Sequence, residues 1–151
     1  MDNKMKIAIG CDHGAYEMKE IIKAHLLDQG IEVDDKGAYS KESVHYPLFA
    51  KAVCKEVQAK NVDFGILLCS TGIGISIAAN KHKGIRAALC GDVYSAKFTR
   101  LHNDANVLCL GALVTGAGVA KMITDTFLST EFEGGRHQTR VDMITAIEEE
   151  Q

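Results

Sequence analysis

The chain has 151 residues, of which 46% are hydrophobic, 25% charged and 6% aromatic. These proportions are typical of a globular protein, and we expect one domain spanning residues 1–151. Seventeen basic residues against twenty acidic ones give a formal charge of −3, which argues against nucleic acid and membrane surfaces as partners. The five cysteines lack a Cys-x-x-Cys spacing, and the N-terminus lacks an apolar signal segment. We therefore expect reduced thiols and a cytoplasmic protein.

Short β-rich runs alternate with longer segments of helical periodicity. A strand is expected at residues 6–10, then a helix whose apolar residues recur at helical spacing from Ala15 until Gly30. A second strand at 31–35 precedes a helix that starts near Tyr46. The other expected strands are 64–69, 85–90 and 106–110, and the other expected helices are 71–80, 93–102, 115–128 and 138–149. The segment 71–80 also alternates like a strand, but a parallel crossover favours a helix there.

Nearly continuous apolar runs at residues 64–69 and 85–90 are typical of strands covered on both faces, inside a parallel sheet, and 106–110 is a weaker case. The sequence thus predicts an α/β fold: a doubly wound five-stranded parallel sheet flanked by helices, plus a C-terminal helix. In such sheets ligands bind beyond the carboxyl ends of the strands, usually where the first and third strands meet. Here those ends are followed by residues 10–14 and 69–74.

The loop at residues 69–74 contains two glycines and small polar residues at the start of a helix, which is typical of a site for an anion or an enediolate. The glycine pair alone is equally consistent with plain strand-to-helix packing. A dinucleotide fingerprint would need a third glycine where Ile77 stands, so NAD is not expected. The spacing of the histidines, cysteines and carboxylates indicates no metal site either.

Cys69 ends a buried strand directly before a helix, where the helix dipole would favour its thiolate and make it a candidate base. Cys54, Cys90 and Cys109 are interpreted instead as buried apolar thiols. Thr71 could relay a proton or hold a substrate hydroxyl, and it could also cap the helix. Contact with the substrate and capping of the helix are compatible roles.

Two further groups of polar residues lie nearer the C-terminus. His102 and Asn103 close a helix, where a histidine is commonly only a partner of the helix dipole. Arg136 and Arg140 are one helical turn apart, a spacing that suits a clamp for a phosphate dianion. The alternative is a solvated basic turn, and the spacing does not decide between the two.

Taken together, these residues resemble the type B ribose-5-phosphate isomerase family, which includes the galactose-6-phosphate isomerase subunits. The resemblance runs nearly end to end, and its specific segments are Gly10-Cys11-Asp12-His13, Tyr46-Pro47 and residues 69–81, 84–87, 102–106 and 134–141. It implies a Rossmann-like aldose–ketose isomerase of phosphorylated sugars that needs no metal and no cofactor. It also implies a homodimer or a dimer of dimers whose active sites are shared between subunits.

The resemblance also implies roles for single residues. Cys69 would move the proton between C1 and C2 with the help of Thr71, and N–H groups of the loop with Ser70, Gly72 and Gly74 would hold the enediolate. The other roles would be ring opening by His102, contacts to hydroxyls or the ring oxygen by Asp12 and His13, pocket lining by Tyr46, further substrate contact by Asn103, and a phosphate grip by Arg136 and Arg140 from the neighbouring subunit.

The chain departs from the family pattern at three positions. Leu113 stands where an arginine usually contacts phosphate, His45 replaces an aspartate, and Ser70 replaces a glycine. Losing one charged hydrogen bond would cost about 2 kcal/mol of affinity, unless a lysine or His137 substitutes or the substrate differs. We expect interconversion of D-ribose 5-phosphate and D-ribulose 5-phosphate. The alternatives are a six-carbon aldose phosphate such as allose or galactose 6-phosphate, and a non-catalytic phosphosugar sensor.

Overall fold

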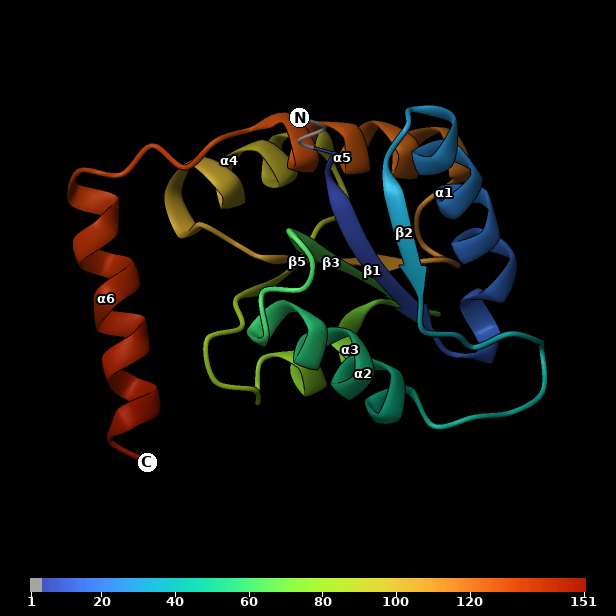
Figure 1. The fold of residues 1–151 in the computed structure, drawn as a ribbon, viewed down its shortest axis with the longest axis horizontal. Helices are drawn as coiled ribbons and strands as arrows, with labels where there is room; N and C mark the ends of the chain where they lie inside the picture. The colour runs from blue at the N-terminus through green and yellow to red at the C-terminus, as the bar shows by residue number, and fades with distance from the viewer. Residues whose placement is uncertain (1–3) are drawn as a thin grey trace.

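The computed structural model describes residues 4–151, and in them five parallel strands form one sheet in the order β2-β1-β3-β5-β4 (Figure 1). The strands are β1 (Lys6–Cys11), β2 (Glu32–Asp35), β3 (Phe64–Cys69), β4 (Ala87–Leu89) and β5 (Val107–Gly111). The helices are α1 (Tyr16–Asp28), α2 (Tyr46–Gln58), α3 (Ile73–Ala79), α4 (Val93–Asn103), α5 (Ala117–Ser129) and α6 (Arg136–Glu149), and a 3-10 turn at His13–Ala15 precedes α1. The expected α/β fold with a doubly wound parallel sheet is confirmed.

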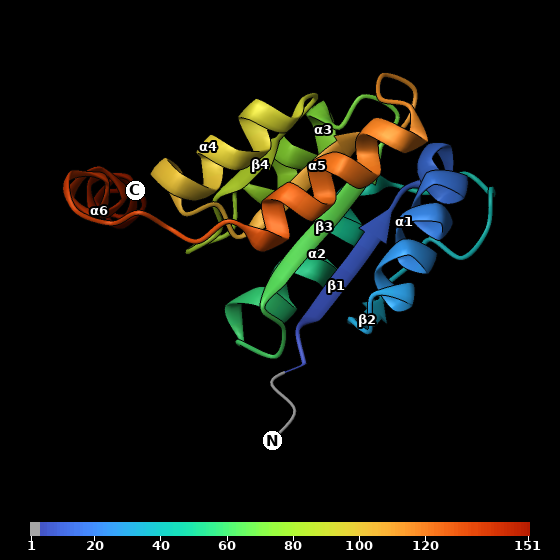
Figure 2. The same cartoon turned by 90° about the horizontal axis from the view of Figure 1, so that it is seen from above.

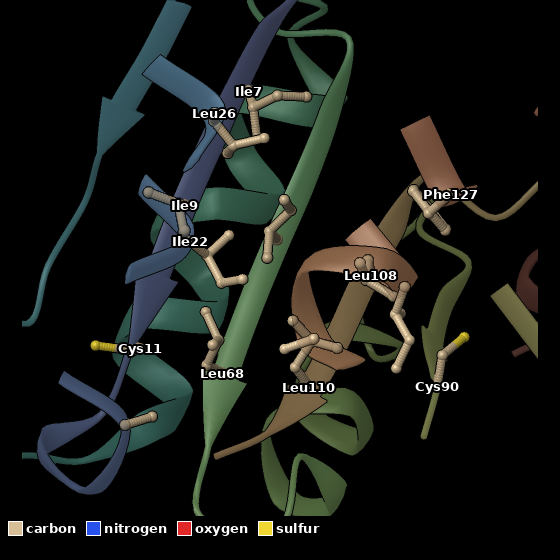
Figure 3. Packing of buried hydrophobic residues seen from close by; sticks show 14 of the residues in the cluster. Ile7, Ile9, Cys11, Ile22, Leu26, Leu68, Cys90, Leu108, Leu110 and Phe127 are labelled. Carbon is tan, nitrogen blue, oxygen red and sulfur yellow. The ribbon is translucent and has the colours of Figure 1, made fainter. Parts of the chain in front are cut away.

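Each face of the sheet is covered by its own helices. Helices α1, α4 and α5 pack on one face, where Ile22 of α1 and Phe127 of α5 are buried with Ile9 and Leu108 of the sheet (Figure 3). Helices α2 and α3 pack on the other face, with a second buried cluster whose members include Ala8, Val53, Leu67, Ile75 and Val107. Burial of these apolar side chains is the main favourable term in folding.

The segment that could have been a strand or a helix is the helix α3. Ile75 and Ala79 lie one turn apart and are both buried, whereas Ile73 and Ile77 are exposed. The helix has seven residues and starts at Ile73, two residues later than expected. The two residues before it belong instead to the loop that leaves β3.

One expected strand takes a different position in the sheet from the one that was expected. Residues 85–90 were expected inside the sheet, but β4 has three residues, pairs only with β5 and forms an edge, where Leu89 is 40% exposed. The weaker case at 106–110 corresponds to β5, which is wholly buried between β3 and β4. The run at 85–90 is nevertheless packed on both faces, because Ile85 is buried in the cluster beneath α2 and α3 and Cys90 is buried in the cluster on the opposite face.

Helix α6 stands apart from the two helical layers, beside the end of α4 (Figures 1 and 2). A groove of about 530 Å³ separates it from β4, and Ile144 and Ile147 of α6 line one wall. The Glu148 carboxylate accepts a hydrogen bond from the Gly84 N–H at 3.1 Å, which ties the end of α6 to the body. In residues 4–151, every helix is too short or too polar to cross a membrane.

Candidate active site

The carboxyl ends of β1 and β3 bring two loops together, as expected for neighbouring strands in this fold. The Asp12 N–H donates to the Leu68 carbonyl at 3.1 Å, so the loop after β1 lies directly on the end of β3. A Cβ on Gly14 would lie only 2.6 Å from the Ser70 Oγ, which shows how closely the loops pack. The Asp12 carboxylate accepts the Gly14 N–H at 3.1 Å, which fixes its orientation.

Cys69, the last residue of β3, is 5% exposed and lies at the mouth of these loops. Its sulfur accepts a hydrogen bond from the Gly72 N–H at 3.1 Å. This contact holds the sulfur beside the backbone turn of the loop. The Thr71 hydroxyl oxygen accepts the Ile73 N–H at 3.1 Å, and its own proton stays available to a ligand.

The base loop, residues 69–74, is held against the end of β5 by close backbone contacts. The Ala112 N–H donates to the Cys69 carbonyl at 2.9 Å. A Cβ on Gly111 would lie 2.4 Å from the Thr71 carbonyl oxygen, so only glycine fits there. Beside Thr71 opens an apolar hollow of about 300 Å³, which Leu89 and Val114 also line. The base loop is therefore rigidly placed and borders a space that a ligand can enter.

Two more expected residues lie beside the base loop. A Cβ on Gly74 would be 2.8 Å from Tyr46 Cζ, so the hydroxyl end of the tyrosine ring lies close against this glycine. His13 accepts the Val44 N–H on Nδ1 at 3.1 Å, which leaves Nε2 to face other groups. The structure thus gathers six of the expected residues with Gly72 and Gly74 at the carboxyl ends of the strands: Asp12, His13, Tyr46, Cys69, Ser70 and Thr71.

The other expected residues lie at the opposite end of the sheet, where the strands begin. Helix α4 runs back across the sheet from the carboxyl end of β4, and the carbonyl of its last residue, Asn103, accepts a hydrogen bond from Arg86 Nε at 3.0 Å. Arg86 directly precedes β4, so α4 ends near the amino ends of the strands. Within one chain, His102 therefore does not meet Cys69. Arg136 and Arg140 are exposed on the first turns of α6.

His102 instead belongs to a cluster that the sequence did not reveal. The His137 ring stacks on the His102 ring with centroids 4.0 Å apart and planes 11° apart. Glu133 Oε2 lies 3.9 Å from His102 Nε2, and Glu133 Oε1 lies 3.8 Å from His137 Nε2. Burial, together with the nearby His102, lowers the pKa of His137 below its ordinary 6.5. We call His102, Glu133 and His137 the histidine cluster.

The histidine cluster is a group of potential metal ligands that the spacing of these residues in the sequence did not indicate. One donor atom from each of its residues lies within 4.8 Å of the other two. The sequence hid this set because His102 closes α4, far along the chain from the other two residues. The one available signal was the spacing of Glu133 and His137, four residues apart around two glycines.

Comparison with known proteins identifies the family of this chain. The Ribose/Galactose Isomerase family model matches residues 7–144. The chain belongs to this family. It is 54% identical to ribose-5-phosphate isomerase B of Escherichia coli K12, in an alignment covering 95% of this chain and 97% of that one.

Solved structures of the family have the same fold. The chain superposes on ribose-5-phosphate isomerase B of Clostridium thermocellum with a TM-score of 0.96 and 51% identity, covering 97% of this chain and 99% of that one. It superposes on the Thermotoga maritima ribose 5-phosphate isomerase with a TM-score of 0.93 and 54% identity, covering 94% and 98%. The family's Rossmann-like sheet is thus shared by this chain from end to end.

Proposed function

We propose that this chain interconverts D-ribose 5-phosphate and D-ribulose 5-phosphate through an enediolate. The observation that carries the proposal is the hydrogen bond from the Gly72 N–H to the Cys69 sulfur, at the mouth of a site bordered by Asp12 and Tyr46. A carbon acid next to a carbonyl needs a base and a group that stabilises the oxyanion, and the base loop offers both. The names of the two ribose-5-phosphate isomerases described above support this substrate.

In this mechanism the Cys69 thiolate takes the proton from C2 of the open-chain aldose. The electron pair of the broken C–H bond forms the C1–C2 double bond, and the negative charge moves to O1. Thr71 assists the proton transfer between O1 and O2, and the Cys69 thiol then returns its proton to C1, which yields the ketose. Asp12 and His13 hold the sugar hydroxyls, and Tyr46 closes one side of the pocket.

The remaining roles require a second copy of the chain. His102 opens the furanose ring, Asn103 contacts the sugar, and Arg136 and Arg140 hold the phosphate as a two-pronged clamp. These residues lie near the amino ends of the strands, whereas Cys69 lies at a carboxyl end. A complete site therefore forms when the α6 side of one subunit faces the base loop of another. The functional unit in this proposal is a homodimer or a dimer of dimers.

Exposed apolar side chains support such an assembly. Ile73, Leu113 and Val114 beside the base loop, and Ile144 and Ile147 on α6, are each more than two-fifths exposed. Apolar groups that gather on a surface are typical of sites covered by another protein. All five cysteines are free thiols, which supports a location in the reducing cytoplasm.

The two alternatives are less well supported. A six-carbon aldose phosphate is suggested by Leu113, but the relatives described above bear the name of the five-carbon substrate. A non-catalytic sensor would need neither a thiol at the base position nor the hydroxyl of Thr71 beside it. Both groups are present and ordered in the base loop.

A coupled assay that compares ribose 5-phosphate with allose 6-phosphate, galactose 6-phosphate and free ribose tests the activity. We expect the highest kcat/KM for ribose 5-phosphate. A higher value for either six-carbon phosphate would contradict the assignment of the substrate, and the absence of turnover with all four sugars would contradict the assignment as an isomerase.

Subunit complementation tests the shared site. The variants Cys69→Ala and Arg136→Ala are each expected to be nearly inactive alone. Mixed after dissociation and reassembly, they form hybrids in which one of the two sites contains neither substitution. Recovery of activity on mixing supports the shared site, and recovery no greater than the sum of the separate variants contradicts it.

A further inference from the structure

The histidine cluster places three potential ligand atoms around one point. One nitrogen of each imidazole and one oxygen of the Glu133 carboxylate all lie within 4.8 Å of one another. The carboxylate oxygens are 3.8 Å and 3.9 Å from the two nitrogens, too far for hydrogen bonds. The three groups thus face one another without bonding directly.

A second observation concerns His137. Its side chain is 6% exposed, and within residues 4–151 its Nε2 atom is buried without any hydrogen-bond partner. Buried polar side-chain atoms nearly always have a partner, so each exception calls for an explanation. This nitrogen lies 3.8 Å from the Glu133 carboxylate, and a ligand bound between the two groups would give it a partner.

We propose that His102, Glu133 and His137 form a binding site for a divalent transition-metal ion such as Zn²⁺. Two imidazoles and one carboxylate are a ligand set that Zn²⁺ and its neighbours favour, with a fourth position left to water. With bonds of about 2.1 Å, tetrahedral coordination puts the donor atoms about 3.4 Å apart.

The donor atoms, now within 4.8 Å of one another, have to move closer together to reach that value. Glu133 is half exposed and is followed by Gly134 and Gly135, so its carboxylate can approach the two rings. The planes of the two rings are now 11° apart, so binding of one ion by both requires the rings to turn relative to each other. The positive charges of Arg136 and Arg140 lie near His137 and oppose a cation, so the ion is bound less tightly than at a structural zinc site.

Metal binding at this place has a consequence that rests on the proposed function. Coordination occupies the Nε2 lone pair of His102, and this nitrogen can then neither accept nor donate the proton that ring opening requires. The ion therefore acts as an inhibitor of the isomerase, and its removal by a chelator restores the activity.

The binding test uses the full chain, treated with a chelator and titrated with Co²⁺, whose visible absorption reports its coordination. We expect one ion per chain, displaced by Zn²⁺. His137→Asn and Glu133→Gln should each weaken binding at least about tenfold. The matched control is His25→Asn. His25 Nε2 pairs with Asp125 at 2.8 Å but has no second imidazole beside it, so this variant should bind Co²⁺ with the affinity of the wild type.

The thiol of Cys69 is the competing ligand, because thiolates also bind these metals. A sulfur-to-cobalt charge-transfer band that disappears in Cys69→Ala would place the ion at the base loop and overturn the proposal. Absence of binding, or binding unchanged in His137→Asn and Glu133→Gln, would overturn it as well.

Inhibition by Zn²⁺ separates this proposal from the proposed function. We expect Zn²⁺ to lower the turnover of the wild-type chain, EDTA to restore it, and Glu133→Gln to resist inhibition relative to its own metal-free rate. Binding at the histidine cluster without inhibition would uphold the metal site and contradict the role of His102 in ring opening.

Discussion

The Gly72 N–H lies 3.1 Å from the Cys69 sulfur and donates a hydrogen bond to it. This contact exists because the chain turns at Gly72 with φ +77°, a left-handed conformation that glycine adopts without strain. The orientation of the sulfur is therefore set by the turn of the base loop as well as by the strand that carries it. Changes to the turn should affect chemistry even where no catalytic side chain is altered.

Gly72→Ala is expected to damage both stability and activity. A Cβ there would lie 2.5 Å from Leu89 Cδ1 and 2.9 Å from the Leu110 carbonyl carbon, in addition to the unfavourable φ. We expect a loss of about 1–3 kcal/mol in the free energy of unfolding and a fall in kcat. The control is Gly118→Ala, which meets nothing within 4 Å; denaturant titrations and assays of both variants check the prediction. Equal stability and kcat in Gly72→Ala and wild type would contradict it.

Lys19 is fully buried and donates to both Asp35 carboxylate oxygens at 2.8 Å. Asp35→Asn would leave this buried ammonium with only the partly exposed Glu20 carboxylate, 3.4 Å away, as a counter-ion, and we expect a loss of about 3–5 kcal/mol. The control is Asp34→Asn, which breaks the partly exposed pair with Lys36 and should cost at most about 1 kcal/mol. Similar losses in the two variants, measured by urea unfolding, would count against the pair.

The same pair predicts a pH dependence. Burial opposes the charged Asp35 carboxylate, but hydrogen bonds from Lys19, the Gly37 N–H and Lys23 outweigh it and lower its pKa below the ordinary 3.8. A carboxyl whose pKa is depressed in the folded state stabilises the fold above its unfolded pKa, and this contribution is lost as the pH falls through the folded pKa. Below about pH 4 the wild type should therefore lose stability more steeply than Asp35→Asn. Parallel curves would contradict this prediction.

Leu113→Arg should strengthen substrate binding. Leu113 is 79% exposed, and its N–H donates to the Ser70 carbonyl at 2.9 Å, so the position lies beside the base loop. One added charged hydrogen bond to the phosphate, at about 2 kcal/mol, should lower KM for ribose 5-phosphate by about tenfold or more. Val114→Arg adds the same charge one residue later. An equal effect in both variants would indicate only a change in net charge.

Arg140→Ala should impair the phosphorylated substrate selectively. Removal of one prong of the proposed clamp loses a charge-assisted hydrogen bond, so KM for ribose 5-phosphate should rise by about tenfold to a hundredfold. Turnover of free ribose should change little, because it has no phosphate to hold. Steady-state kinetics with both sugars test this prediction. Equal effects on the KM values of the two sugars would contradict the proposed phosphate clamp.

The sequence predicts the fold because its strands and helices carry strong local signals. The buried runs at β1 and β3 and the helical periods of α1 and α2 are all where they were expected. The error at β4 concerns only its position in the sheet, because an edge strand that is covered on both faces has the same apolar pattern as a strand between two others. Ile85 and Cys90 are buried in the clusters on opposite faces of the sheet, although β4 itself pairs only with β5.

The site could be predicted only in part. The residues around Cys69 follow two neighbouring strands, and the rule for the carboxyl ends of parallel strands brings them together. The contact of His137 with His102 depends on how α6 begins beside the end of α4, and nothing in the local pattern indicates that contact. The separation of His102 from Cys69 likewise follows from the direction in which α4 crosses the sheet.

The most direct test of the account is the transfer of hydrogen by Cys69. In D₂O, the wild-type chain should incorporate deuterium at C1 of ribulose 5-phosphate during turnover. Cys69→Ala should lose both turnover and deuterium incorporation by at least about 10²–10⁴-fold, while calorimetry shows that it still binds ribose 5-phosphate. Turnover and deuterium incorporation by Cys69→Ala at the wild-type rate would show that another group is the base.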